Sequence, residues 1–159
     1  MKVCIIGDGL VGLILAKVLA KKALSVDIFS NSKLKKYSQT RTIGITKSNI
    51  NYLNRNVLNI EKILWEIKQI KIYTENFKNS EILNFSNLSE QIFSIVKNNE
   101  LYDVLRKNLI YDKFVKFKKN KDYKKIIKEN YNLIINCDLN NQITKKFFSK
   151  RIKKKYYSF

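Results

Sequence analysis

The first twelve residues constrain the fold of this chain more than any other stretch. An apolar segment, 3–6, runs into the sequence Gly7-Asp8-Gly9-Leu10-Val11-Gly12, whose glycines have the spacing G-x-G-x-x-G. In such a turn the first glycine permits a tight bend, and the second lets a pyrophosphate approach the backbone. The third lets a helix pack closely on the strand. The spacing therefore predicts a strand, a turn that binds a dinucleotide, and a helix.

The neighbouring sequence supplies the rest of a β-α-β unit. Residues 13–22 carry apolar side chains at helical intervals, and residues 25–29 form a second apolar run. At the end of the expected helix, Ala23 stands where a glycine in the left-handed conformation would be commonest. Free amide groups at the start of the helix favour an anionic phosphate. The residues expected to contact the cofactor here are Gly7, Gly9, Leu10, Val11 and Gly12.

Ser30 follows the second strand, at a position where a nucleotide-binding unit normally carries an acid that binds the ribose hydroxyls. Two interpretations remain open. A small residue followed by cations such as Lys33 and Lys35 suits a 2′-phosphate, as in NADP. Alternatively, the ribose contact has simply been lost. Asp27 is expected to lie too early in the strand to replace it.

Composition limits the remaining functions. The chain has 159 residues, which is the length of one domain, and 45% of them are hydrophobic. The formal charge of +19 invites a nucleic-acid or anionic-membrane partner. However, abundant Lys, Asn and Ile with no Pro is what A/T-rich coding sequence produces, so a nucleic-acid partner is not favoured.

Residue types exclude several kinds of chemistry. The sequence has no histidine, which rules out a Ser-His-Asp triad, a His-ligated metal and imidazole catalysis. Cys4 and Cys137 lie in expected strands without metal or redox spacing, so no metal site is expected and a reduced, cytoplasmic setting fits best. No apolar run approaches the length of ~20 residues that a membrane span needs.

The rest of the chain reads as connecting structure. Helices are expected over 48–57, with Ser48 as N-cap, over 60–66 and over 99–109. Strands are expected at 114–117 and 133–137, and 67–74 with 82–85 reads as an antiparallel hairpin. For Trp65 and Tyr73, burial in a core is favoured over lining a ring pocket. The C-terminal run from Lys145 alternates cations with rings, which suits packing against further chain or, alternatively, binding to anionic lipid or RNA.

Four motifs, taken together, resemble a known family. They are the turn 7–13, the segment 39–46 (QTRTIGIT), the segment 93–105 (FSIVKNNELYDVL) and the segment 131–138 (YNLIINCD). Their order and separations are similar to those of FAD-dependent aromatic-ring hydroxylases, and most of all to the ubiquinone-biosynthesis type, the 2-polyprenyl-6-methoxyphenol hydroxylases. The resemblance implies a Rossmann-like α/β domain that binds FAD, is reduced by NAD(P)H and inserts one oxygen atom of O2 into an aromatic ring.

The resemblance also implies roles for two further residues. Arg41 occupies the segment whose arginine contacts the flavin cofactor in the family, and a guanidinium suits phosphate. Asp138 stands at the aspartate of the family's Asp-Gly motif, near the cofactor at the end of a parallel strand, although Leu139 replaces the glycine. Gln142 and Lys145 stand where the family usually has Ser and Arg. No catalytic residue is assigned.

The expected protein is therefore a single FAD/NAD(P)-binding Rossmann-like domain over 1–159, with a parallel sheet and a hairpin inserted at about 67–90. Because the family continues well beyond this length, a truncated form is expected that binds the ADP portion of FAD. The implied partners are a polyprenylated aromatic substrate and a ubiquinone-synthesis complex at the inner membrane. The alternatives are a non-catalytic NADP- or FAD-binding module, and a basic protein that associates with membrane or RNA.

Overall fold

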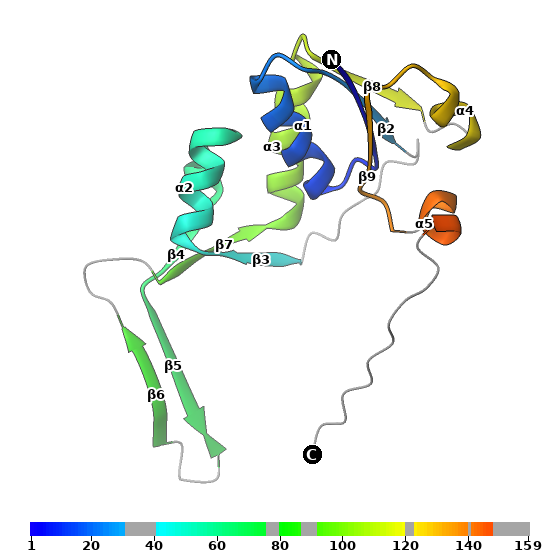
Figure 1. Ribbon diagram of the computed structural model, residues 1–159. Helices are drawn as coiled ribbons and strands as arrows, with labels where there is room; N and C mark the ends of the chain where they lie inside the picture. The colour runs from blue at the N-terminus through cyan, green and yellow to red at the C-terminus, as the bar shows by residue number, and fades with distance from the viewer. Residues whose placement is uncertain (31–40, 76–79, 87–91, 120–122, 140, 148–159) are drawn as a thin grey trace. The chain divides into compact units, whose positions relative to one another are not determined.

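The computed structural model describes residues 1–30, 41–75, 80–86, 92–119, 123–139 and 141–147 (Figure 1). The chain divides into two compact units. Unit 1 comprises residues 1–33 and 112–159, and unit 2 comprises residues 34–111. Each unit contains two of the four motifs identified in the sequence. Unit 1 contains 7–13 and 131–138, and unit 2 contains 39–46 and 93–105.

Unit 1 is built on a four-stranded parallel sheet. Its strands are β1 (Lys2–Ile6), β2 (Ser25–Ser30), β8 (Val115–Lys119) and β9 (Leu133–Asn136). They lie in the order β8-β2-β1-β9, with every neighbouring pair parallel. Numbered within the sheet, this order is 3-2-1-4, as in a Rossmann-type fold. The expected α/β fold with a parallel sheet is confirmed.

One face of this sheet packs on helix α1 (Leu10–Lys21). The helix forms because its apolar residues recur at intervals that place Leu13, Ala16 and Ala20 on one buried stripe. They cover strand residues that alternate along β1 and β2, including Ile5 and Ile28. Helix α1 begins at Leu10, three residues before the predicted start.

The opposite face holds a second apolar cluster. Cys4, Ile6 and Phe29 from the sheet pack with Ile126 of α4 (Tyr123–Lys128) and Ile143 of α5 (Gln142–Phe147). Cys4 and Cys137 are free thiols, and burial raises the pKa of Cys4 to about 12, which keeps it protonated. Both sheet faces are therefore covered, as a parallel sheet requires.

Helix α1 ends as the sequence indicates, with Ala23 in the left-handed conformation at φ 56°. The amide of Leu24 donates to the carbonyl of Leu19 and the amide of Ala23 donates to that of Ala20. This is the Schellman arrangement, which normally takes glycine at the position of Ala23. The alanine therefore carries strain that its methyl group creates.

Unit 2 contains a three-stranded antiparallel sheet and two helices. The strands lie in the order β3 (Thr42–Ile45), β7 (Phe93–Lys97) and β4 (Trp65–Ile67). The helices are α2 (Lys47–Asn56) and α3 (Asn98–Ile110). Their buried hydrophobic residues are Ile50, Leu53, Leu101, Tyr102, Leu105 and Leu109. The helices expected over 48–57 and 99–109 are confirmed, although Thr46, not Ser48, caps α2 by accepting from the amide of Asn49.

The helix expected over 60–66 is wrong. The structure has a short 3-10 turn there, η1 (Glu61–Ile63), and after Leu64 the chain enters β4, which pairs with β7. Sheet pairing with a distant segment overrides the local apolar spacing here. A single strand was expected over 67–74, but Ile67, its first residue, belongs to β4.

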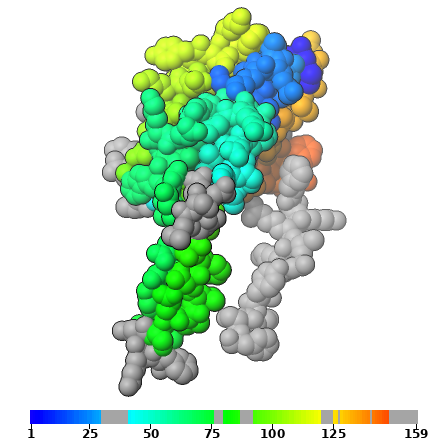
Figure 2. Space-filling model, turned by 90° about the vertical axis from the view of Figure 1, so that its left-hand side faces the viewer, coloured from blue at the N-terminus to red at the C-terminus, as the bar shows by residue number. Residues whose placement is uncertain are grey.

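A separate hairpin follows, as expected, from β5 (Gln69–Thr74) and β6 (Ser80–Ser86). Its pairs Ile70–Phe85 and Ile72–Leu83 share one face, and every residue of β6 is exposed (Figure 2, green). Trp65 and Tyr73 are 56% and 55% exposed, so the favoured expectation that they are buried is wrong. A two-stranded ribbon offers no second layer to cover Tyr73.

Candidate functional site

The turn after β1 is shaped by its first glycine. Gly7 has φ +106°, a conformation that side chains rarely permit. Its amide donates to the carbonyl oxygen of Phe29 at 2.9 Å, which fixes the turn beside the end of β2. The G-x-G-x-x-G motif thus lies between a strand and a helix, as the sequence predicted.

The third glycine brings the helix against the turn. A Cβ atom on Gly12 would lie 2.2 Å from the carbonyl oxygen of Gly7 and 3.4 Å from Cγ2 of Ile5. No side chain fits there, so the N-terminal amides of α1 stay next to the turn. This cradle of backbone N–H groups and a helix N-terminus is what a pyrophosphate requires.

The middle of the turn is open. Gly9 precedes α1 in an extended conformation (φ −72°, ψ 175°), and its carbonyl accepts from the amide of Leu13. Leu10 is half-buried and Val11 is 70% exposed at the start of the helix. The first turn of α1 contains no acidic residue that would oppose an anion. The contacts of these residues with a cofactor remain predictions.

Asp138 lies directly against the glycine turn. A Cβ atom on Gly7 would be 3.1 Å from both the Cβ and the amide nitrogen of Asp138. The loop that carries Asp138 is held by Asn136, whose Oδ1 accepts from the Asp138 amide, and by Thr144, whose hydroxyl donates to the Asp138 carbonyl. The structure thus brings together two motifs that are 131 positions apart, since 138 − 7 = 131.

Ser30 ends β2, where it pairs with Lys119 of β8. The cations Lys33 and Lys35, which one interpretation of Ser30 used, lie outside the described residues. Among the described residues of β2, the one carboxylate belongs to Asp27, and its side chain is 2% exposed on the face opposite α1. Asp27 is therefore turned away from any ligand at the edge of the sheet.

Asp27 is the centre of a buried polar cluster. Its Oδ2 accepts from Tyr131 at 2.7 Å and forms ion pairs with Lys118 at 2.8 Å and Lys2 at 3.3 Å. Burial alone would raise the pKa of Asp27, but the hydrogen bonds from these three groups lower it below its ordinary value. The hydrogen bond to Asp27 raises the pKa of Lys118, so both groups stay charged. The cluster ties four segments of unit 1 together.

In unit 2, Arg41 precedes β3 and its side chain is exposed. The carbonyl of Arg41 accepts from the amide of Asn98, the first residue of α3, at 2.9 Å. The Oδ1 atoms of Asn98 and Asn99 are buried without a hydrogen-bond partner among the described residues, and Asn98 is 6% exposed. A buried acceptor without a donor is costly unless a ligand or water supplies one. A role for Asn98 was not predicted from the sequence.

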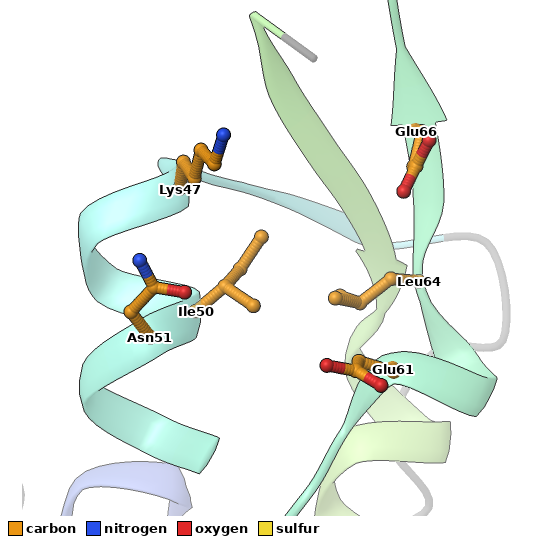
Figure 3. Close-up of a pocket in the computed structure, with 6 residues that line it drawn as sticks. All are labelled: Lys47, Ile50, Asn51, Glu61, Leu64 and Glu66. Atoms are coloured by element: carbon orange, nitrogen blue, oxygen red, sulfur yellow. The ribbon is translucent and has the colours of Figure 1, made fainter. Parts of the chain in front are cut away.

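Unit 2 also contains a cavity of about 250 Å³ between α2 and β4. Its side chains are Lys47, Ile50, Asn51, Glu61, Leu64 and Glu66. Ile50 and Leu64 point toward one another across the cavity (Figure 3). None of the residues predicted to bind the cofactor lines it, and neither do Trp65 and Tyr73.

A metal centre and a membrane-spanning helix are both lacking among the described residues. No group of three or more His, Cys, Asp or Glu side chains there is arranged to hold a metal ion. No helix among the same residues has the length and apolar character needed to cross a membrane.

Comparison with known proteins finds relatives by structure and not by sequence. No protein-family model and no curated protein matches the sequence. The structure is similar to PqsL, a probable FAD-dependent monooxygenase from Pseudomonas aeruginosa, with a TM-score of 0.69, 10% identity and 99% of this chain covered. The chain shares the fold of PqsL.

Two further solved structures show the same likeness. The p-nitrophenol 4-monooxygenase PnpA from Pseudomonas putida DLL-E4 has a TM-score of 0.61 and 18% identity over 74% of this chain. The 2-methyl-3-hydroxypyridine-5-carboxylic acid oxygenase has a TM-score of 0.61 and 16% identity over 75%. This chain spans 48% of the length of PqsL and 31% of each of these two proteins.

Proposed function

We propose that this chain is the FAD-binding part of a monooxygenase that hydroxylates an aromatic ring, with NAD(P)H as reductant. The observation that carries the proposal is the turn from β1 to α1, where Gly7 and Gly12 exclude side chains and Asp138 lies against Gly7. The shared fold with PqsL and PnpA, both named as monooxygenases, supports it.

The residues of unit 1 fit the ADP portion of FAD. The amides at the start of α1 would hold the pyrophosphate, and the absence of a side chain on Gly9 would let it approach the backbone. Leu10 and Val11 would contact the same group from the first turn of the helix. Asp138, through the backbone of its loop, would border the cofactor at the carboxyl end of β9.

In unit 2, taken by itself, two residues suit the polar groups of a flavin cofactor. The guanidinium of Arg41 matches phosphate oxygens through its fork of donors. The unpartnered Oδ1 of Asn98 would accept from a cofactor hydroxyl, which would satisfy a buried acceptor. Bound flavin would activate O2, and the residues of this chain would bind and orient the flavin.

The four sequence motifs extend the proposal to the ubiquinone-biosynthesis type of hydroxylase. The substrate would then be a polyprenylated phenol, met at the cytoplasmic side of the inner membrane within a multiprotein complex. A non-catalytic module that binds FAD or NADP is the second candidate, and it is supported by the glycine turn, whose backbone would suit the pyrophosphate of either nucleotide.

The test is flavin binding by the purified full chain. We expect bound flavin in the absorbance spectrum, or quenching of flavin fluorescence when FAD is titrated. Arg41→Ala should weaken FAD binding about tenfold, because it removes a charge-assisted contact. The matched variant Arg55→Ala should leave FAD binding unchanged. A protein that binds NADPH but not FAD would support the second candidate, and one that binds neither would contradict both.

A further inference from the structure

One face of the hairpin formed by β5 and β6 is polar, and its side chains partner one another. Nε2 of Gln69 donates to Oδ1 of Asn84 at 3.3 Å, across the two strands. Lys71 forms an ion pair with Glu81, also at 3.3 Å. The polar groups of this face therefore find partners within the hairpin itself.

The other face of the hairpin is apolar and uncovered. It carries the cross-strand pairs Ile70–Phe85 and Ile72–Leu83. Ile72, Leu83 and Phe85 are 42%, 48% and 51% exposed. An isolated two-stranded ribbon is at best marginally stable in water, and further strands on the same apolar face stabilise it. The hairpin thus gains stability from any partner that extends its sheet.

The outer edge of β6 is where such a strand can be added. The hairpin is a two-stranded sheet, so the backbone groups along the outer edge of β6 face no strand among the described residues. Exposed edges are usually protected by charges, prolines or bulges. In β6 the single charged residue is Glu81, and the pairing with β5 is regular from Leu83 to Ser86. This stretch is open to β-strand addition.

The sequence of this edge matches a second copy of itself. In an antiparallel pair of β6 strands centred on Asn84, Leu83 of each copy lies opposite Phe85 of the other. The apolar faces of both hairpins then continue across four strands. The two Asn84 amides meet on the polar face, where each can donate and accept. A register centred on Leu83 would instead set Glu81 against Phe85.

Charge also favours a second copy over other occupants. The whole chain has a formal charge of +19, so two copies repel each other. Residues 69–86, however, contain two lysines and two glutamates, and the hairpin has no net charge. Two copies can therefore meet at their hairpins without adding to that repulsion. An anionic lipid surface would favour an excess of cations beside the apolar face, which the hairpin lacks.

We propose that β6 is a self-association edge, at which two copies of this chain join their hairpins into one four-stranded antiparallel sheet. The inference concerns the hairpin alone and does not depend on the nucleotide site. One added strand pair buries less than the ~800 Å² per partner of a stable interface. The dimer is therefore weak and reversible, with a dissociation constant in the micromolar range.

The experiment is sedimentation equilibrium of the full chain from about 1 μM to about 1 mM, which spans that range. We expect a reversible monomer–dimer equilibrium that shifts toward dimer as salt screens the repulsion between copies. Asn84→Lys should weaken the dimer at least about tenfold, because it sets two like charges opposite one another. Gln69→Lys adds the same charge to the same face of β5, away from the edge, and is the matched control.

A charge swap tests the register. Asn84→Glu alone should also weaken the dimer, whereas an equal mixture of Asn84→Lys and Asn84→Glu should restore it, because opposite charges then meet. Asn84 is exposed, so both variants should fold, and circular dichroism checks this. If Asn84→Lys does not fold, Asn84→Asp, which is close to Asn84 in size, provides the same like-charge test. A mixture that remains as monomeric as each variant alone overturns the pairing centred on Asn84.

The remaining outcomes decide between a second copy and other occupants. A chain that stays monomeric at every concentration overturns the inference, and so does a monomer that binds anionic vesicles through the hairpin. Equal weakening by Asn84→Lys and Gln69→Lys would assign the effect to net charge and overturns it too. Failure to bind FAD together with an intact dimer would contradict the proposed function and leave this inference standing.

Discussion

Gly12 lies so close to Gly7 that a side-chain carbon on Gly12 would be 2.2 Å from the Gly7 carbonyl oxygen. Real Cβ atoms do not approach a backbone oxygen so closely, so any other residue would push α1 away from the turn. Gly7, meanwhile, adopts φ +106° and meets Asp138 on its other side. The three glycines of one motif therefore serve different purposes, and their substitutions should have different effects.

Gly12→Ala should lower the free energy of unfolding by about 2 kcal/mol, because the methyl group forces helix and turn apart. Urea unfolding followed by circular dichroism measures this. Gly44→Ala is a suitable control, since a Cβ there meets the Phe93 ring at an ordinary 3.6 Å. Equal stability of Gly12→Ala and the unmodified chain would show that α1 and the turn are further apart than described.

Gly9→Val should leave stability within about 1 kcal/mol, because φ −72° and ψ 175° are allowed for any residue. It should abolish binding of FAD, since the side chain would occupy the path of the pyrophosphate. Fluorescence titration with FAD and thermal unfolding separate the two effects. Unchanged affinity for FAD would show that the pyrophosphate does not bind at this turn.

Asp27→Asn should lower the free energy of unfolding at pH 7 by about 3 kcal/mol, because it leaves Lys118 and Lys2 beside a neutral group. The folded-state pKa of Asp27 lies below its ordinary value of 3.8. Its contribution is therefore complete above about pH 4 and disappears as the pH falls through the folded-state pKa.

A pH series of urea unfolding curves tests the prediction for Asp27. The unmodified chain should lose stability below about pH 4, and Asp27→Asn should lose less over the same range. Asp103→Asn, on the exposed side of α3, serves as the control and should resemble the unmodified chain. Parallel pH profiles for the chain and Asp27→Asn would count against the buried ion pairs.

Ala23→Gly should stabilise the chain by about 1 kcal/mol, because glycine adopts φ 56° without the steric cost of a methyl group. Ala20→Gly provides the contrast, since Ala20 is buried inside α1 and its loss should destabilise by at least about 1 kcal/mol. Thermal unfolding of both variants gives the comparison. Destabilisation by Ala23→Gly would contradict the left-handed assignment.

Much of unit 1 follows from local sequence. The apolar run before Gly7, the glycine spacing and the helical stripe of α1 each depend on neighbouring residues, and the structure reproduces all three. The left-handed conformation of Ala23 likewise depends on its neighbours, because Ala23 lies at the end of α1. In unit 2, by contrast, the helix predicted over 60–66 does not form, because the end of this segment pairs with β7, which comes more than 25 positions later in the chain. Long-range pairing leaves no periodic signal in a short segment.

The sequence by itself determined the β-α-β unit and its phosphate turn, because glycine spacing and side-chain periodicity act over a few residues. Only the tertiary structure decided that Asp138 lies against Gly7, that Asp27 is enclosed by Lys118, Lys2 and Tyr131, and that Lys119 ends the strand beside Ser30. Those relationships arise from strand order and register. Both are set by which apolar faces are buried together, and that is a property of the whole sheet.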